Sequence, residues 1–406
     1  MVIFTRKKKK ITVIGGGNAG CLTALHYGYY TDKIKNQIFS DTDYEIELIH
    51  NPDRSPEKVG QGTLIDVVDL LWNSLQFTWM ENDVEATLKL GILYEGWGKK
   101  NDFVLHPLYK GTLHVSPNKL QNAILKSGYF EVREGDDVEY DDIDSDYIFD
   151  CRGKPAEIDG NDLYKELDGY VNAVILAQDS KRDLQQNWTR AVATPDGWCF
   201  SIPLFNATSY GYLYNHKITS YEKAKENFEK LFNVEATDDF HFNQYVAKKP
   251  IIDDRIILNG NKLFFLEPLE ATAMSSYLWW ARRTYDWIVE PLESMATPDT
   301  ITKDFHTYVA QINNFISWHY SYGSKYNTPF WEEAKKNSFI KFMRRDDEFD
   351  RVLKLVKDCS MREILKHCNN DNRQDTFYAQ WTAWSFKYWH DGMVSKKEYP
   401  NHYPFV

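Results

Sequence analysis

The stretch ITVIGGGNAGCLTALHYGYY, residues 11–30, decides the fold of this 406-residue chain. Its apolar start at 11–14 predicts a buried parallel strand, and its last ten residues predict a helix. Between them, Gly15, Gly17 and Gly20 fit the pattern G-x-G-x-x-G. The first glycine of this pattern permits a tight turn, the second lets backbone N–H groups approach a pyrophosphate, and the third lets helix and strand pack closely. The stretch therefore predicts a nucleotide-binding turn, with the helix N-terminus facing the phosphate charge.

A second strand is predicted for YEIELIH at 44–50, which completes the opening of a dinucleotide-binding unit. Such units usually carry an Asp or Glu at the end of this strand, where it binds a ribose hydroxyl. Here His50 and Asn51 occupy that place, and either side chain can still hydrogen-bond a hydroxyl. The glycine loop alone therefore leaves NAD and FAD open as the nucleotide.

The composition excludes several classes of function. Acidic residues outnumber Lys and Arg by 59 to 48, a net charge of -11, so the chain lacks the broad basic field of a nucleic-acid-binding protein. The basic run at 6–10 is interpreted as a solvated lead-in to the first strand. No stretch reaches the roughly 18 apolar residues that a membrane helix needs. Five cysteines without CxxC spacing indicate neither a disulfide framework nor a zinc site, and favour a reducing cytoplasm.

Patterns along the rest of the chain predict an α/β fold with a helical C-terminal part. The predicted elements are helices at 64–77 and 116–128, a buried strand at 147–149, an antiparallel hairpin at 200–214 and a helix from 219. Ser116 is expected to cap the second of these helices and Gly128 to end it. Thr219 and Glu222 are expected to form a capping box on the last. From residue 270 onward the pattern is mostly helical.

Five further segments carry a resemblance. They are VGQGT at 59–63, LKLGILYEGW at 88–97, WCFSIP at 198–203, FLEPLEATAM at 265–274 and ISWHYSYGSKYNTPFW at 316–331. In this order, behind the N-terminal glycine loop, the set resembles the flavin-dependent halogenases of the tryptophan-halogenase family, and in particular compact members of the kind carried by phages. Three positions depart from the family pattern: Phe200 replaces a Trp, Ala273 replaces a Gly, and His50 replaces an acid.

The resemblance implies a fold and a reaction. The fold is an FAD-binding Rossmann-like core of the glutathione-reductase and flavin-monooxygenase type, with an added antiparallel sheet, at 1–290, followed by a mainly helical substrate-side region at 291–406. In the reaction, reduced FAD from a separate flavin reductase meets O2 and forms a C4a-hydroperoxide. This species oxidises a halide ion to hypohalous acid, which halogenates a small, electron-rich aromatic substrate of the indole or phenol type. A homo-oligomeric assembly is compatible with this interpretation.

The resemblance also assigns catalytic roles. Lys89 is expected to deliver the halogen, either by hydrogen-bonding hypohalous acid or as a haloamine, and burial would favour its neutral amine by lowering its pKa. Glu270 is expected to polarise the hypohalous acid, or to stabilise and deprotonate the cationic intermediate on the aromatic ring. Thr272 and Ala273 match the halide site. The extra methyl group of Ala273 motivates the hypothesis that bromide or iodide is preferred to chloride.

Further positions are expected to bind the cofactor or to separate it from the substrate. The expected FAD contacts are Gly15, Gly17, Asn18, Ala19, Gly20, His50, Val59, Gly62, Val138 and Met274. The expected barrier between flavin and substrate consists of Trp198, Phe200, Ile202 and Pro203. A set of C-terminal aromatic residues could sandwich the substrate, although such stripes at helical spacing more often form core: Tyr378, Trp381, Trp384, Tyr388 and Trp389. No metal site is expected.

Two alternatives stay open at this point. A flavin monooxygenase or oxidase would place its substrate against the flavin and would not need Lys89. A non-catalytic FAD-binding protein would bind the cofactor and form no product with any halide. Halide-dependent turnover that collapses in Lys89→Ala distinguishes the halogenase from both.

Overall fold

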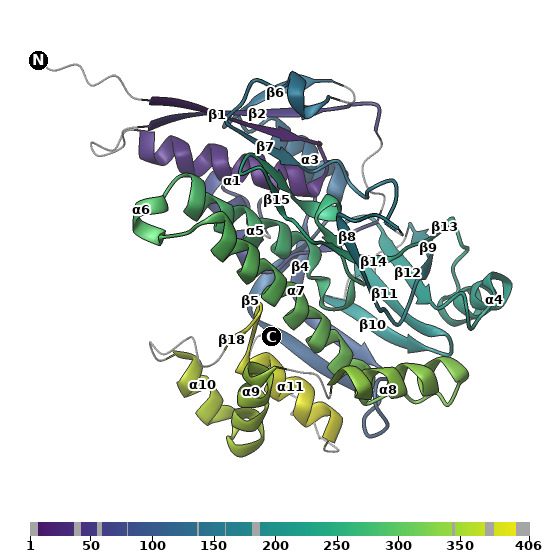
Figure 1. Cartoon of the computed structure of the whole chain (residues 1–406). Helices are drawn as coiled ribbons and strands as arrows, with labels where there is room; N and C mark the ends of the chain where they lie inside the picture. Colours follow the sequence, from purple (N-terminus) through teal and green to yellow (C-terminus); the bar gives the residue numbers. More distant parts are fainter. Residues whose placement is uncertain are drawn as a thin grey trace, which may run out of the picture.

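The computed structural model describes residues 7–35, 42–54, 59–78, 80–135, 138–158, 160–180, 187–342, 346–369 and 377–394. The predicted opening unit is confirmed as β1 (Lys7–Ile14), α1 (Asn18–Lys35) and β2 (Thr42–His50), with β1 and β2 parallel. The strand predicted at 147–149 is also confirmed as β7 (Tyr147–Asp150), which pairs with the other side of β1. The first sheet of six strands therefore centres on β1, as expected of a Rossmann-like core (Figure 1).

The first sheet is completed at both edges by short strands. These are β6 (Glu131–Glu134), β15 (Ile251–Ile252) and β16 (Ile256–Leu258), in the order β15-β16-β7-β1-β2-β6. The basic run was expected to be a solvated segment that precedes the first strand. This interpretation was wrong for the lysines that the structure describes, because they belong to the continuous strand Lys7–Ile14. Acidic residues on β2 explain the difference: Lys8 pairs with Glu45 at 3.0 Å and Lys10 with Glu47 at 3.1 Å.

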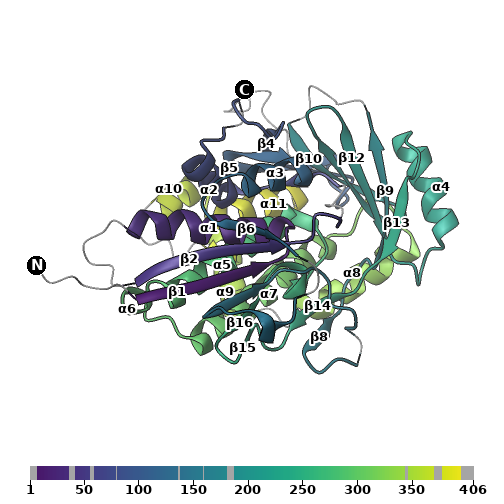
Figure 2. The same ribbon diagram turned by 90° about the horizontal axis from the view of Figure 1, so that it is seen from above.

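A second sheet has eight strands in the order β13-β9-β12-β11-β10-β4-β5-β3. Their bounds are β3 (Gln61–Gly62), β4 (Thr87–Glu95), β5 (Phe103–Val115), β9 (Ala173–Asp179), β10 (Trp188–Thr194), β11 (Gly197–Pro203), β12 (Thr208–Tyr214) and β13 (Asp238–His241). The predicted hairpin at 200–214 is confirmed as β11 and β12, which are antiparallel. Figure 2 shows this sheet beside the first one, with α4 (Tyr221–Phe232) lying along its outer edge near β9 and β13.

Two helix ends differ from the sequence expectation. The α4 helix is capped by Ser220, which accepts from the Lys223 N–H, and not by Thr219. The Thr219 hydroxyl donates instead to Asp196, a buried carboxylate that local sequence cannot reveal. The α3 helix (Pro117–Leu125) does start after Ser116, but the Ser116 side chain makes no capping hydrogen bond, and the helix ends before Gly128.

The remaining α-helices and strands are mostly helices, and all but α2 and β8 lie beyond residue 243; from residue 270 onward the chain is mostly helical, as expected. They are α2 (Ile65–Leu75), β8 (Tyr164–Leu167), β14 (Gln244–Ala247), β17 (Phe264–Phe265), α5 (Ala273–Ile288), α6 (Pro291–Ser294), α7 (Pro298–Ser321), α8 (Pro329–Phe342), α9 (Asp347–Asp358), α10 (Met361–Asn369), β18 (Phe377–Tyr378), β19 (Trp381–Thr382) and α11 (Ala383–Val394). Figure 1 shows α9, α10 and α11 gathered at one end of the molecule, below β5. The division of the chain between residues 290 and 291 stays a prediction.

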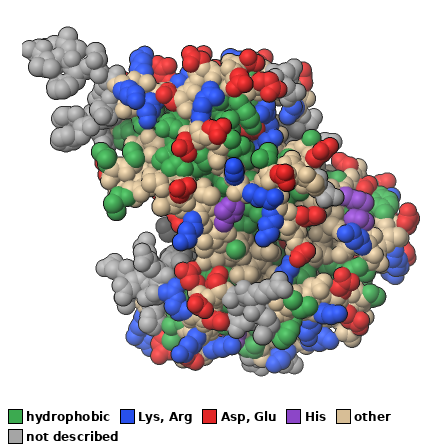
Figure 3. Space-filling view, in the orientation of Figure 1, with side chains coloured by type: hydrophobic (Ala, Val, Ile, Leu, Met, Phe, Trp, Pro, Cys, Tyr) green, Lys and Arg blue, Asp and Glu red, His purple; other side chains and the backbone are tan. Residues whose placement is uncertain are grey.

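Charged side chains of both signs intermingle over the face drawn in Figure 3. This distribution agrees with the acidic net charge of -11. Within the described ranges, no helix has the length and apolar character that crossing a membrane requires. The same ranges hold no cluster of three or more potential metal ligands.

Candidate active site

The glycine loop lines a cavity of about 350 Å³ at the carboxyl ends of β1 and β2. Gly15 adopts φ +112°, and a Cβ there would lie 2.6 Å from the Cys151 carbonyl oxygen, so this turn requires glycine. A Cβ on Gly20 would lie 1.8 Å from the Gly15 carbonyl oxygen, whereas Gly17 faces open space. These three environments match the roles that the pattern assigns to its glycines.

The polar groups around this cavity suit a phosphate-bearing dinucleotide. His50 lines the cavity, and α1 begins beside it. The Asn18 Nδ2 is buried and finds no hydrogen-bond partner in the described part of the chain, although its Oδ1 accepts from Gln121 at 2.9 Å. Ala19 packs near Gly260 and is also buried. A loop with open space at its second glycine, placed at the start of a helix, fits a bound anionic group.

Val138 lies elsewhere. It packs against the small cluster of Ile14, Ile143 and Ile148, and its carbonyl oxygen accepts from Arg152 at 3.0 Å. It lines neither the cavity at the glycine loop nor the larger cavity beside the eight-stranded sheet. Its expected contact with FAD therefore stays a prediction.

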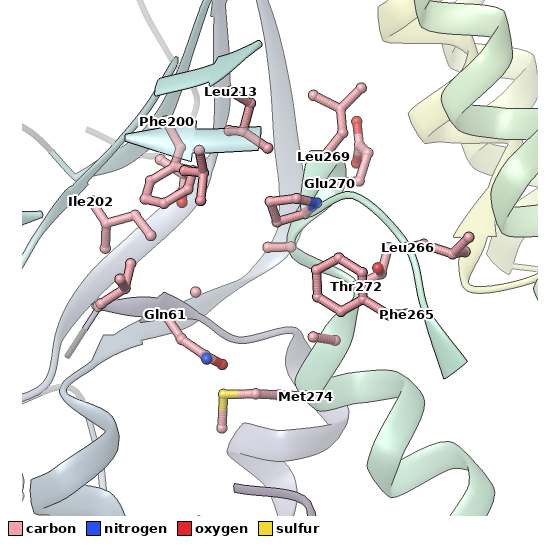
Figure 4. Close-up of a pocket in the computed structure, with 18 of the residues that line it drawn as sticks. Gln61, Phe200, Ile202, Leu213, Phe265, Leu266, Leu269, Glu270, Thr272 and Met274 are labelled. Atoms are coloured by element: carbon pink, nitrogen blue, oxygen red, sulfur yellow. The ribbon is translucent and has the colours of Figure 1, made fainter. Parts of the chain in front are cut away.

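The larger cavity, of about 520 Å³, lies between the eight-stranded sheet and the segment at 264–277 (Figure 4). Nine of the residues singled out from the sequence line it: Val59, Gly62, Trp198, Phe200, Ile202, Glu270, Thr272, Ala273 and Met274. Pro203 and Lys89 are not among its lining residues. Figure 4 shows Phe200 and Ile202 on the sheet side, opposite Thr272 and Met274. A mostly apolar slot between a sheet and a helix start suits a flat ring system.

The α5 helix starts at the wall of this cavity, at the two positions expected to bind halide. Glu270 and Ala271, just before it, both adopt left-handed backbone conformations, with φ +72° and +54°. Two consecutive non-glycine residues in this region cost about 1–2 kcal/mol each. The resulting turn leaves Thr272 and Ala273 at the helix N-terminus, where backbone N–H groups and the helix dipole favour an anion.

Lys89 is fully buried on β4, and its Nζ donates to the Thr63 carbonyl oxygen at 3.0 Å. Burial lowers the pKa of Lys89 from 10.5 to about 8, while the negative charge of Glu270 opposes the shift. The register between β4 and β5 shifts between Lys89 and Gly91. On either side of this irregularity Lys89, Ile92 and Tyr94 are all buried.

Gly62 lies between Lys89 and the larger cavity. It lines that cavity, and a Cβ on Gly62 would lie 2.9 Å from the Lys89 Nζ. The ammonium group therefore packs against a residue of the cavity wall. No ion pair within 4.0 Å joins Lys89 to Glu270, so the two charges interact across a gap.

The Glu270 carboxylate is held by four donors from four separate parts of the chain. Its Oε1 accepts from the Tyr94 hydroxyl, from His106 Nδ1 at 2.9 Å and from His319 Nε2 at 2.9 Å. Its Oε2 accepts from Trp381 Nε1 at 3.1 Å. Figure 4 shows the side chain directed away from Thr272 and Met274. We call these four residues the Glu270 cage.

The cage decides the charge state of Glu270. Burial acts to raise its pKa, but the charges and hydrogen bonds of His106 and His319 outweigh burial and hold the pKa well below 4.5. Burial, followed by the charge of Glu270, raises the pKa of Tyr94 well above its ordinary value, so its hydroxyl remains a donor. The site therefore holds an ionised, immobilised carboxylate.

Sequence reasoning missed three members of the cage as functional candidates. His319 lies inside the quoted segment at 316–331, so a signal for it was present. Tyr94 likewise lies inside the quoted segment at 88–97, whereas His106 lies in none of them, and only its position on β5, paired with β4, brings it to Glu270. Trp381 was singled out as a substrate contact, which stays a prediction, and its indole N–H donates to Glu270.

The other aromatic candidates pack mainly against protein. Trp389 is fully buried and stacks on His319 with ring centroids 4.0 Å apart. Tyr378 is buried and its hydroxyl donates to Asp346 at 2.8 Å. Trp384 packs against Tyr388, which is half-buried. This arrangement is the aromatic core that helical spacing favours.

A second buried carboxyl group, Glu267, lies three residues before Glu270. Its Oε1 accepts from the Tyr320 hydroxyl at 2.7 Å, and Gln244 approaches its Oε2. Burial raises the pKa of Glu267 to about 7, against the lowering effect of Tyr320 and other neighbours. Their surroundings therefore shift the pKa values of these two carboxyl groups in opposite directions, upward for Glu267 and downward for Glu270.

Comparison with known proteins gives concordant matches. The sequence model of the tryptophan halogenase family matches residues 10–123 and 130–404. Tryptophan 7-halogenase KtzQ from Kutzneria sp. (strain 744) is 22% identical over 210 residues, which are 48% of this chain and 39% of that protein. The matched region thus spans less than half the length of this curated relative.

Solved structures extend the match to almost the whole chain. A tryptophan halogenase from Shewanella frigidimarina NCIMB 400 superposes with a TM-score of 0.73 at 17% identity, covering 100% of this chain and 92% of that one. A flavin-dependent halogenase from Xanthomonas campestris gives a TM-score of 0.73 at 16% identity, covering 98% and 91%. At these identities the likeness shows the fold, which is therefore confirmed as the expected α/β type with a helical C-terminal region.

Proposed function

Since the chain belongs to the tryptophan halogenase family, we propose that it is an FAD-dependent halogenase that delivers halogen through Lys89 to an aromatic substrate. One observation carries this proposal. The Lys89 ammonium, with a pKa lowered to about 8, is buried against Gly62 in the wall of an apolar cavity that opens on a helix N-terminus, and it interacts across a gap with the ionised Glu270 carboxylate. A monooxygenase, which transfers oxygen directly from its cofactor, has no need of this buried amine.

The residues around the two cavities fit FAD. The loop at Gly15 and Gly17 would hold its pyrophosphate, and the slot lined by Gly62, Ile202 and Met274 would hold its ring system. Bound reduced FAD would supply, with O2, the oxidising equivalents that convert halide into hypohalous acid. A separate flavin reductase would supply the reduced form. We place this chemistry in the cytoplasm, in keeping with an odd number of cysteines of which the four described are free.

In this proposal the protein supplies position and charge. Thr272 and Ala273 would hold the halide at the start of α5, where N–H groups are available. Trp198 and Phe200, both buried on β11, would keep an organic substrate away from the cofactor so that halogen and not oxygen is transferred. The Lys89 ammonium would hydrogen-bond hypohalous acid, and its amine would be accessible near pH 8 as a halogen carrier.

The substrate class is an electron-rich aromatic compound of the indole or phenol type. Curated relatives act on tryptophan according to their names, and this motivates indoles as the first compounds to test. The preference for bromide or iodide over chloride is part of the proposal. It is motivated by Ala273, whose methyl group narrows the halide site relative to glycine.

The test is a mass-spectrometric assay of a mixed indole and phenol panel. It contains the protein, FAD, a flavin reductase with its reductant, O2, and chloride, bromide or iodide in separate and competing reactions. We expect halogenated products that depend on halide and disappear in Lys89→Ala, with bromide or iodide incorporated before chloride. Hydroxylated products that persist in Lys89→Ala would establish a monooxygenase instead. FAD binding without any product would establish a non-catalytic protein, and preferred chloride turnover would refute the halide preference.

A further inference from the structure

The indole ring of Trp198 lies in the wall of the larger cavity, and its N–H group is unused. Trp198 is 2% exposed and lines this cavity together with Phe200, which follows two positions later on β11. The Trp198 Nε1 is buried and makes no hydrogen bond of ordinary length to any described residue. A buried donor without a partner costs about 1–3 kcal/mol. The N–H therefore does not yet fix the position of the ring.

Two tryptophans that bind the neighbouring strand β10 show the usual arrangement. The Trp97 N–H donates to the Ala191 carbonyl oxygen at 3.0 Å, and the Trp331 N–H donates to the Thr194 carbonyl oxygen at 2.7 Å. The strand β10 pairs with β11, which carries Trp198. A backbone carbonyl cannot change its charge, so pH does not alter these two contacts. The Trp198 N–H is the exception among these three indoles.

An acceptor for this N–H is available in the Glu267 carboxyl group. Leu266 and Pro268, on either side of Glu267, line the same cavity as Trp198. Burial raises the pKa values of Glu267 and Tyr320, and the Trp198 N–H acts against both shifts, which places it beside both groups. The Tyr320 hydroxyl already donates to the Glu267 Oε1 at 2.7 Å. Of the two groups, Glu267 is the one that becomes a stronger acceptor when it loses its proton.

The second oxygen of Glu267 has room for another donor. Its Oε2 is approached only at 3.5 Å, by the Gln244 Nε2, among the hydrogen-bond donors of the described residues. A carboxylate offers about four lone-pair positions, whereas a protonated carboxyl group uses one of them for its own O–H. Hydrogen bonds to an ionised acceptor are also roughly twice as strong as neutral ones. The Trp198 N–H therefore gains a good partner only when Glu267 is ionised.

Titratable groups from three parts of the chain face Glu267. Tyr320 comes from α7, Lys341 comes from α8, and Tyr170 precedes β9. The Tyr170 ring stacks on Tyr320 with centroids 4.0 Å apart, and the Lys341 Nζ lies 4.6 Å from its centroid. Burial raises the pKa of both tyrosines, so both stay neutral. Burial lowers the pKa of Lys341, and the charges of Asp168 and Glu267 oppose this shift.

The balance of these effects leaves both forms of Glu267 accessible. Burial raises its pKa to about 7, although the Tyr320 hydrogen bond and the Lys341 charge act in the opposite direction. From one pH unit below this value to one unit above it, the protonated fraction falls from about 90% to about 10%. The acceptor beside Trp198 therefore changes its charge near neutral pH.

We propose that Glu267 is a positioning residue for the barrier: its carboxylate accepts the Trp198 N–H and holds the ring in the cavity wall, and its protonated form releases the ring. The consequence for the reaction rests on the proposed halogenase function, in which Trp198 separates substrate from cofactor. A released ring admits water to the cavity, and excluding water is what prevents side reactions. Reduced FAD and O2 that fail to oxidise a halide leave as FAD and hydrogen peroxide. This loss should therefore fall as pH rises through the titration of Glu267.

The direct test is the indole N–H signal of Trp198 in protein labelled with ¹⁵N-tryptophan, with oxidised FAD bound, followed by NMR from pH 5 to 9. Trp198→Phe identifies the signal. We expect it to move downfield with a midpoint near pH 7 in the wild type and to stay constant in Glu267→Gln. Lys341→Met should raise the midpoint, because it removes a positive charge that favours the carboxylate. The signals of Trp97 and Trp331 are internal controls and should not titrate.

The functional test measures hydrogen peroxide released for each reduced FAD consumed, at pH 6 and pH 8. We expect a several-fold fall between these values in the wild type. Glu267→Gln should show the higher release at both, with circular dichroism and FAD binding establishing that it is folded. Trp198→Ala should also show the higher release at both, and adding Glu267→Gln to it should change nothing further. An equal increase caused by Glu267→Gln with and without Trp198 would overturn the proposal, because Glu267 would then act elsewhere.

Failure of this role and failure of the proposed function are distinguishable. Hypohalous acid is measured separately by trapping it with a 1,3-diketone in place of the substrate. A Trp198 signal that does not titrate, in a protein that forms hypohalous acid, would overturn the role of Glu267 and leave the halogenase function standing. A wild type that forms neither hypohalous acid nor a halogenated product would overturn the proposed function and the barrier role with it.

Discussion

Replacing Lys89 by methionine is expected to stabilise the protein while it abolishes halogenation. The ammonium group is fully buried, and no carboxylate of the described residues lies within ion-pair distance of it. Its pKa falls from 10.5 to about 8 because burial disfavours the charge. Methionine has a similar length and no charge, so it removes this cost and fills the same space.

The size of the effect follows from proton linkage. Each tenfold change in proton affinity is worth about 1.4 kcal/mol, so a pKa that moves from 10.5 to about 8 corresponds to about 3 kcal/mol. Losing the hydrogen bond to the Thr63 carbonyl oxygen offsets about 1 kcal/mol. The net gain is about 2 kcal/mol at pH 7. With an unfolding entropy of about 2.1 cal/mol/K for each of 406 residues, the melting temperature rises by roughly 2–3 °C.

The pH dependence gives the sharper test. Below pH 8 the lysine is charged in both the folded and the unfolded state, so the full cost of burial is present. Between pH 8 and 10.5 the folded lysine loses its proton while the unfolded lysine keeps it, so the wild type gains stability as pH rises. The advantage of Lys89→Met should therefore shrink through this window and change sign near its upper end.

The assay is urea unfolding of wild type and Lys89→Met side by side at pH 7 and pH 10, combined with the halogenation assay at pH 7. Lys387→Met is the control, because the Lys387 Nζ is also buried but is paired with Asp391 at 3.3 Å and with the Val356 carbonyl oxygen at 2.8 Å. This control should lose stability at pH 7. A stability difference between Lys89→Met and wild type that is the same at both pH values would refute the reasoning.

Three further outcomes are expected. Gly62→Ala should lower the halogenation rate at least about 10-fold, because the new Cβ would lie 2.9 Å from the Lys89 Nζ and displace it. The amount of trapped hypohalous acid should fall little. An equal loss of halogenation and of hypohalous acid would place the defect at the cofactor. Phe200→Trp should lower the free energy of unfolding, measured by calorimetry, by about 1–3 kcal/mol. The Phe200 ring already packs directly on Gly211, so closely that a Cβ on Gly211 would lie 2.1 Å from it, and a larger ring would overpack this site. Unchanged stability would show that the site can hold the larger ring. Glu267 binds a proton with a pKa of about 7 when folded but 4.5 when unfolded, so wild-type stability falls as pH rises between these values. Glu267→Gln should remove that fall, and equal slopes for both proteins from pH 5 to 8 would contradict it.

Local sequence was sufficient for the nucleotide-binding turn. The requirement for glycine at Gly15 comes from its own φ of +112° and from the next strand of the sheet, and the requirement at Gly20 comes from Gly15 itself. The three glycines lie within a few residues of one another, so their spacing can be recognised in the sequence. The hairpin of β11 and β12 was predictable for a similar reason, because its strands are joined by a short connection.

The exact ends of the helices, in contrast, depended on residues that are distant in the sequence. Thr219 and Ser220 are both acceptable caps by type, and the choice was made by Asp196, which takes the Thr219 hydroxyl. The lysines at the start of β1 became part of the strand because acids on β2 face them. A sequence pattern shows which hydrogen bonds or ion pairs a residue could make. It does not show which distant residue will fold next to it and take that interaction.

The sequence by itself determined the fold class, the family and the two residues, Lys89 and Glu270, on which the proposed chemistry depends. Only the tertiary structure decided the state of Glu270, because its four donors lie 176, 164, 49 and 111 positions away in the chain. Hydrogen bonds and burial act through space, and no periodicity links β4, β5, α7 and the C-terminal hairpin. The same folding leaves one nitrogen of His106 without a partner among the described residues, which no reading of the sequence could have shown.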